Sequence, residues 1–138
     1  MVASRLLLTI LAVFVVRTGL NFVFYGQIMA DHMRTLQQTH PGVFREVIPG
    51  FVTTDLIWAA VFCFLFAKVG RSLGIGVSAG VTLGVIVAIL GQVLGNLYLF
   101  FSTTYMTSTN VMMDSVYALV SHAIQGAVAA LVYKHPGA

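Results

Sequence analysis

Arg17 is a cationic side chain inside a long apolar stretch of the sequence, residues 6–29. If that stretch is a helix across a membrane, Arg17 lies about 18 Å from Arg5 along its axis, close to the bilayer centre. A charge at that depth costs at least ~2.5 kcal/mol. We therefore expect the guanidinium to face the protein interior and to pair with an acid.

Two aspartates in other apolar stretches are candidates for that acid. Asp55 lies about 20 Å from Lys68 at the same helical rise, which makes it level with Arg17. Asp114 lies about 30 Å from Lys134, nearer the opposite membrane boundary. The sequence therefore predicts an Arg17–Asp55 ion pair, with Asp114 as the alternative partner. Such a pair either fixes helix register or takes part in function.

Further polar side chains recur at helical spacing inside the apolar stretches. Asn21 and Tyr25 follow Arg17 at i+4 and i+8, and His122 and Gln125 share one helix face. Each amide could simply bond a neighbouring helix, worth ~0.6–2 kcal/mol. Alternatively, the residues together line a polar pocket or pathway in one half of the bundle. The candidates for this pocket are Arg17, Asn21, Asp55, Gln92, Asn96, Asp114, His122 and Gln125.

His122 could also be an axial ligand of haem or of a chlorophyll-type pigment, or a titrating group. A hydrogen-bonded core histidine is the simpler interpretation. Asp31, His32 and His40 match no established metal-ligand spacing. We therefore expect no metal site and most simply no cofactor, with a pigment bound through His122 as the alternative.

The elements that must position these residues are four apolar segments, each near the roughly 20 residues that a helix needs to cross a bilayer. The 138-residue chain is 59% hydrophobic and 8% charged, whereas soluble domains carry about 25% charged residues. Backbone groups in lipid must pair within their own segment, which requires helices. The sequence predicts an all-α integral membrane four-helix bundle, one domain over 1–138, with spans at 6–29, 51–69, 73–101 and 111–133.

The connections between these spans differ in length. The first is the longest, and within it Val43, Phe44, Val47 and Ile48 recur at helical spacing, which predicts a short interfacial helix in the first outer loop. The connection between the second and third spans is tight, so we expect an antiparallel hairpin there.

Basic residues set the expected orientation. One end of the bundle carries four basic residues, and the other carries two basic and two acidic ones: Arg5, Lys68, Arg71 and Lys134 against Arg34, Arg45, Asp31 and Glu46. The positive-inside rule then places both termini in the cytoplasm. We expect a multi-pass protein of the inner (plasma) membrane.

The third span also carries small residues at every third or fourth position: Gly80, Gly84, Ala88, Gly91 and Gly95. Such a stripe allows a neighbouring backbone to approach closely. We expect it to pack against another helix of the same chain, with a dimer interface as the alternative.

Several classes of function are disfavoured. The basic residues are scattered, which is not typical of nucleic-acid binding. No phosphate loop, HExxH, GxSxG or CxxC motif occurs, and a single cysteine, Cys63, excludes an internal disulfide.

The layout resembles uncharacterised small four-span bacterial inner-membrane proteins. The matching features are the sequence Phe22-Val23-Phe24-Tyr25-Gly26, a long loop with His40-Pro41, a hairpin and a final span. This resemblance covers most of the chain but implies no activity.

We expect a non-enzymatic accessory subunit of a membrane complex, or a small-ligand-binding bundle. Membrane lipids and either a protein partner or a second copy would surround it. A small-solute or proton-coupled transporter or channel that uses the same polar residues is the alternative, and a haem- or pigment-binding protein is the second alternative.

Overall fold

Helices make up nearly all of the computed structural model, which describes residues 3–43 and 47–134. The α-helices are α1 (Ala3–Val23), α2 (Ala30–Thr39), α3 (Ile48–Val69), α4 (Gly76–Val87), α5 (Leu94–Ser102) and α6 (Ser108–Tyr133). Two π-helical segments, η1 (Phe24–Ile28) and η3 (Ala88–Val93), extend α1 and join α4 to α5. A 3₁₀ turn, η2 (Gly70–Leu73), follows α3.

Four helical runs are long and apolar enough to cross a membrane, which confirms the four predicted apolar helices. They cover Ala3–Ile28, Ile48–Leu73, Gly76–Ser102 and Ser108–Tyr133, with mean hydropathies between 1.5 and 2.2. The second run begins three residues earlier than predicted because Pro49 lies in its first turn, where a missing N–H costs no helical hydrogen bond.

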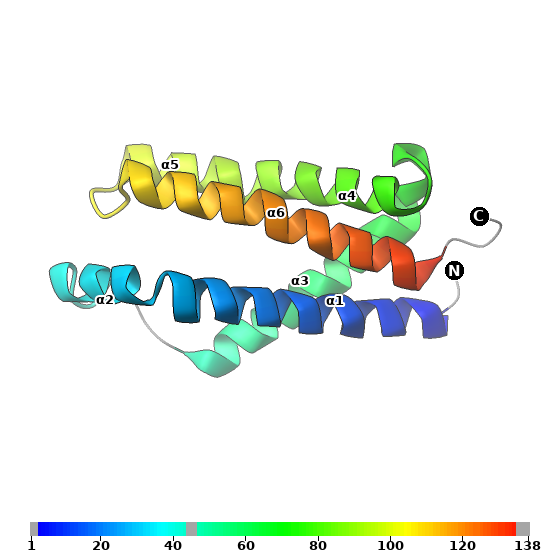
Figure 1. Ribbon diagram of the computed structural model, residues 1–138, viewed down its shortest axis with the longest axis horizontal. Coiled ribbons are helices and arrows are strands. Elements are labelled where there is room, and N and C mark those ends of the chain that lie inside the picture. The colour runs from blue at the N-terminus through cyan, green and yellow to red at the C-terminus, as the bar shows by residue number, and fades with distance from the viewer. Residues whose placement is uncertain (1–2, 44–46, 135–138) are drawn as a thin grey trace.

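Helix α6 is central to the packing (Figure 1). It packs along α4 on one side and along α1 on the other, while α3 packs mainly against α1 and crosses it obliquely. The prediction that the second and third spans pack against each other as an antiparallel hairpin is therefore wrong. The turn between them is short, but α3 and α4 diverge from it because the small residues of α4 fit against α6.

The glycine stripe explains how α4 and α6 come so close. A Cβ at Gly80 would overlap the carbonyl of Gly126, and one at Gly84 would overlap the carbonyl of His122. The first part of the predicted stripe therefore packs within the chain. Gly91 and Gly95 do not, since nothing lies within 4 Å of a Cβ built at either position.

The hydrophobic core fills the half of the bundle nearest the chain ends. It includes Val13, Ala59, Phe62, Cys63, Phe66, Leu83 and Tyr133, all buried. Arg5 Nη1 donates to the Lys134 carbonyl at 3.2 Å, which ties the start of α1 to the end of α6. Many other large apolar side chains point outward, as expected for a surface that lipid covers.

The first loop contains α2, which lies beyond α1 at the end of the bundle opposite the chain ends (Figure 1). Leu36 is its buried residue. The interfacial helix predicted around 43–48 falls largely on residues 44–46, outside the described residues. Val47 and Ile48 belong instead to the beginning of α3, as its N-cap and first residue.

Candidate functional site

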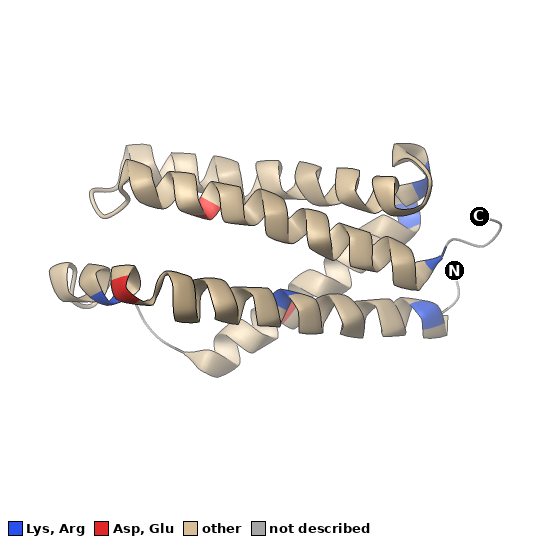
Figure 2. Cartoon of the chain, viewed as in Figure 1, with Lys and Arg blue, Asp and Glu red and all other residues tan. Residues whose placement is uncertain are grey.

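The most densely bonded polar cluster lies midway along α1, where Arg17 meets Asp55 of α3. We call it the Arg17 centre, and it comprises Arg17, Thr18, Asn21, Asp55 and Tyr117. The Arg17 Nε donates to Asp55 Oδ1 at 2.7 Å, and both side chains are largely buried. In Figure 2 the blue and red segments of this pair lie side by side where α1 crosses α3.

Asp55 receives donors on both of its oxygens. Besides Arg17, Asn21 Nδ2 lies 3.0 Å from Oδ1 and 3.2 Å from Oδ2, and Thr18 Oγ1 donates to Oδ2 at 3.2 Å. Spacing explains the set, since residues i and i+4 of α1 lie on one face and Thr18 is adjacent to Arg17. The carboxylate is therefore satisfied by its own bundle, as a buried charge requires.

A third helix, α6, contributes Tyr117 to the Arg17 centre. Its hydroxyl donates to Asn21 Oδ1 at 2.6 Å, so Asn21 links the carboxylate of α3 to the tyrosine of α6. Thr18 and Tyr117 were not among the predicted site residues. The position of Thr18 beside Arg17 was the available signal, whereas Tyr117 carried none in the sequence.

An aromatic bridge joins Arg17 to His122. The guanidinium carbon lies 4.3 Å from the Trp58 ring centroid, a cation–π geometry, and Trp58 meets the His122 ring edge-on at 4.9 Å. His122 Nδ1 lies 2.8 Å from the Ala118 carbonyl, which can only accept, so Nδ1 carries the proton. His122 is 3% exposed, and a pigment bound to it would have to open this packing.

A second polar cluster, which we call the Asp114 centre, comprises Tyr25, Gln92 and Asp114. The Tyr25 hydroxyl donates to Asp114 Oδ1 at 3.1 Å, and Gln92 Nε2 lies 3.4 Å from the same hydroxyl. Asp114 was the alternative partner predicted for Arg17. That alternative is wrong in this structure, because Asp114 lies one helical turn from Tyr117, farther along α6 from the Arg17 centre.

Stacked aromatic rings lie between the two centres. Phe24 stacks on Tyr117 with ring centroids 3.9 Å apart, and Tyr25 meets Tyr117 edge-on at 5.6 Å. The predicted single polar pocket is thus divided into two clusters that touch through tyrosines.

Besides His122, two predicted pocket residues join neither cluster. Gln125 is 0% exposed, and neither its amide oxygen nor its amide nitrogen has a hydrogen-bond partner among the described residues. Asn96 is 7% exposed, and its Nδ2 also lacks one there. Asn96 nevertheless lies one turn beyond Gln92 along the same span.

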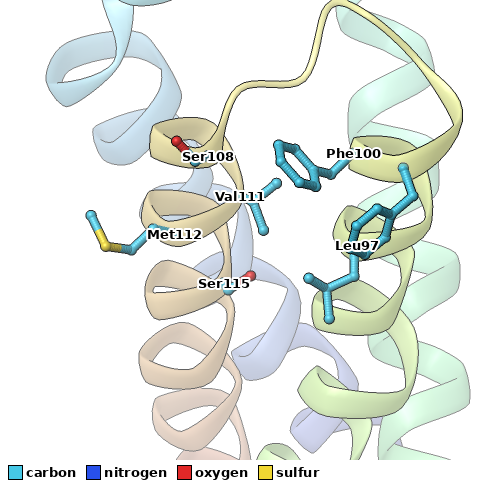
Figure 3. A pocket seen from close by; sticks show the side chains of 7 residues that line it. Leu97, Phe100, Ser108, Val111, Met112 and Ser115 are labelled. Atoms are coloured by element: carbon cyan, nitrogen blue, oxygen red, sulfur yellow. The ribbon is translucent and has the colours of Figure 1, made fainter.

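A hollow lies between α5 and the start of α6, and none of the side chains that form the two centres lines it. It measures about 290 Å³ and is lined mostly by apolar side chains, with Ser115, the residue after Asp114, at its inner edge (Figure 3). Within 3–43 and 47–134, no group of three His, Cys, Asp or Glu side chains could hold a metal ion. Comparisons with protein-family models, curated proteins and solved structures gave no match.

Proposed function

We propose that this chain is a non-enzymatic integral membrane protein that serves as an accessory subunit of a larger membrane complex or as a small homo-oligomer. The observation that carries the proposal is the saturation of Asp55. Its two oxygens accept from Arg17, Thr18 and Asn21 of the same bundle. A carboxylate that binds a transported solute or moves a proton has to exchange its partners, and this one is held by several at once.

Energetics support a positioning role for the pair. Removing one member of a buried ion pair leaves an uncompensated charge and costs about 3–5 kcal/mol, whereas replacing both members by apolar residues is often neutral. The centre therefore adds little net stability but strongly disfavours any packing that separates Arg17 from Asp55. Because Asn21 and Tyr117 extend the bonding to α6, three helices are held in one register.

The proposed placement is the inner (plasma) membrane with both chain ends in the cytoplasm. Figure 2 shows blue segments gathered at the end of the bundle where N and C lie, which agrees with the positive-inside rule. Apart from α2 and the short turns, the described residues belong to the four spans. Partners would therefore be met chiefly within the bilayer.

Three variants test the role of the pair: Arg17→Leu, Asp55→Leu and the double variant. We expect each single variant to lose about 3–5 kcal/mol of stability and the double variant to recover most of it.

Liposomes containing wild-type protein should show no more proton flux than empty ones, measured with an enclosed pH-sensitive dye. If liposomes with wild-type protein do show proton flux, and the folded double variant shows none, the pair takes part in transport and a purely positioning role is contradicted.

Size after extraction in mild detergent tests the accessory role. We expect an assembly larger than one chain, either with a distinct protein or with copies of itself, by light scattering and mass spectrometry. A lone monomer would contradict both forms of the proposal.

A small-solute or proton-coupled transporter is the second candidate, favoured by one observation. Polar side chains continue from Asp114 through Tyr25 and Tyr117 to Asn21 and Asp55, with hydrogen bonds at both ends of this series. The rings of the two tyrosines adjoin between them. The flux measurement above separates this candidate from the accessory role.

A further inference from the structure

The Asp114 centre is assembled by two irregular segments of backbone. Tyr25 lies in η1 and Gln92 lies in η3, and these are the two π-helical segments within the described part of the chain. π-Helical turns are rare and occur frequently at functional sites. Here η1 supplies the Tyr25 hydroxyl that donates to Asp114, and η3 supplies the Gln92 amide that donates to this hydroxyl, although the two segments belong to different spans.

Asp114 differs from Asp55 in its partners. Asp55 has Arg17 and two further donors, whereas Asp114 has one hydrogen bond among the described residues, from the neutral Tyr25 hydroxyl to Oδ1. No Arg or Lys of the described residues pairs with Asp114, and its Oδ2 accepts no hydrogen bond from them. A carboxylate within a span that lacks a cationic partner is costly unless a charge compensates it.

Buried polar atoms without partners occur in the segments that adjoin the Asp114 centre. Five buried side-chain polar atoms lack a hydrogen-bond partner among the described residues, and three of them belong to His32, Asn96 and Ser115. Ser115 follows Asp114 directly, Asn96 lies one turn beyond Gln92, and His32 of α2 is close enough to Asp114 to interact electrostatically. Asn96 is more than nine-tenths buried. Segments that adjoin the Asp114 centre therefore carry buried polar atoms that are free to bond.

We infer that the Asp114 centre binds a small monovalent cation. The Asp114 carboxylate would supply the charge, and the Tyr25 hydroxyl and the Gln92 amide oxygen would be neutral oxygen ligands. Hard cations prefer such oxygen ligands. A single carboxylate matches one positive charge. The inference does not depend on the role of the Arg17 centre.

Thermal unfolding of the purified protein tests this inference. Trp58 is the single tryptophan, so its fluorescence reports unfolding of the bundle. NaCl, KCl or NH₄Cl replaces choline chloride at constant pH and ionic strength. We expect the unfolding midpoint to rise with at least one small cation and to saturate, as ligand binding to the folded state requires.

Asp114→Asn keeps the shape of the side chain and removes its charge, so this variant should lose the cation-dependent rise. Asp31→Asn is the matched control, because that aspartate is exposed on α2 and pairs with Arg34; it should keep the wild-type response. If Asp114→Asn does not fold, Tyr25→Phe is measured in its place, and it should shift the response to several-fold higher cation concentrations.

Three results would overturn the inference. The first is an equal response to choline, which would show a general effect of salt. The second is a full response in Asp114→Asn, or in Tyr25→Phe where that variant replaces it. The third is a midpoint that follows pH but none of the three cations, since a proton would then occupy the carboxylate.

Discussion

The contact between α4 and α6 depends on glycines that no larger residue can replace without moving a backbone. A Cβ at Gly84 would overlap the carbonyl oxygen of His122, and Gly80 and Gly126 stand in the same relation to each other. Backbone carbonyls within helices cannot rotate away as a flexible side chain can. We therefore predict that Gly84→Ala forces α4 and α6 apart.

The size of the effect follows from two opposing contributions. Overpacking of a well-packed interface costs typically about 1–3 kcal/mol, and a clash with backbone belongs at the upper end. Alanine gains about 1 kcal/mol over glycine in helix propensity. The net loss in the free energy of unfolding is therefore about 2 kcal/mol for Gly84→Ala, and a similar loss is expected for Gly126→Ala.

Unfolding by a denaturing detergent, followed by circular dichroism, measures this loss. Gly95→Ala in α5 is the matched control, because nothing lies within 4 Å of a Cβ at that position, and it should be neutral or stabilising by up to about 1 kcal/mol. Equal unfolding free energies for Gly84→Ala and Gly95→Ala would refute the close approach of α4 and α6 described above.

Two further substitutions probe buried polar groups with the same unfolding measurement. Gln125→Leu should raise the free energy of unfolding by about 1 kcal/mol, because it removes a buried amide that has no partner among the described residues, which costs ~1–3 kcal/mol; a loss instead would show that the amide is bonded. Tyr117→Phe should lower it by about 0.5–1.5 kcal/mol by removing the hydrogen bond to Asn21. In an Asn21→Leu background the Tyr117→Phe loss should vanish, and strictly additive losses would contradict the coupling.

Depth along helices was the most informative sequence signal for the candidate site. Counting residues from the flanking basic side chains placed Arg17 and Asp55 at one level, and the structure has them in contact. Hydropathy alone located the four helices that are long and apolar enough to cross a membrane. Trp58 and Tyr117 could not be assigned in this way, because their roles depend on how α3 and α6 are rotated about their own axes, and span length and hydropathy do not determine rotation.

The π-helical segment η3 explains why Gly91 and Gly95 do not pack against a neighbouring helix as predicted, and also why Gln92 lies where it does. The prediction assumed a continuous period of 3.6 residues from Gly80 to Gly95. A π-turn accommodates one extra residue, and one residue corresponds to about 100° of rotation. Beyond η3, the face that would have carried Gly91 and Gly95 is therefore turned away from α6, and Gln92 and Asn96 take its place.

The same local irregularity thus ends the close packing of α4 with α6 and brings the Gln92 amide to the Tyr25 hydroxyl of the Asp114 centre. In a regular helix, glycines would face α6 throughout, and Gln92 would be rotated away from Tyr25. The Asp114 centre depends on a departure from regular helix geometry in η3. Residues that pack tightly, Gly80 and Gly84, precede the irregular segment, and residues with unused polar atoms, such as Asn96, follow it. This division favours structural packing as the role of the first half of the span and ligand binding as the role of the second.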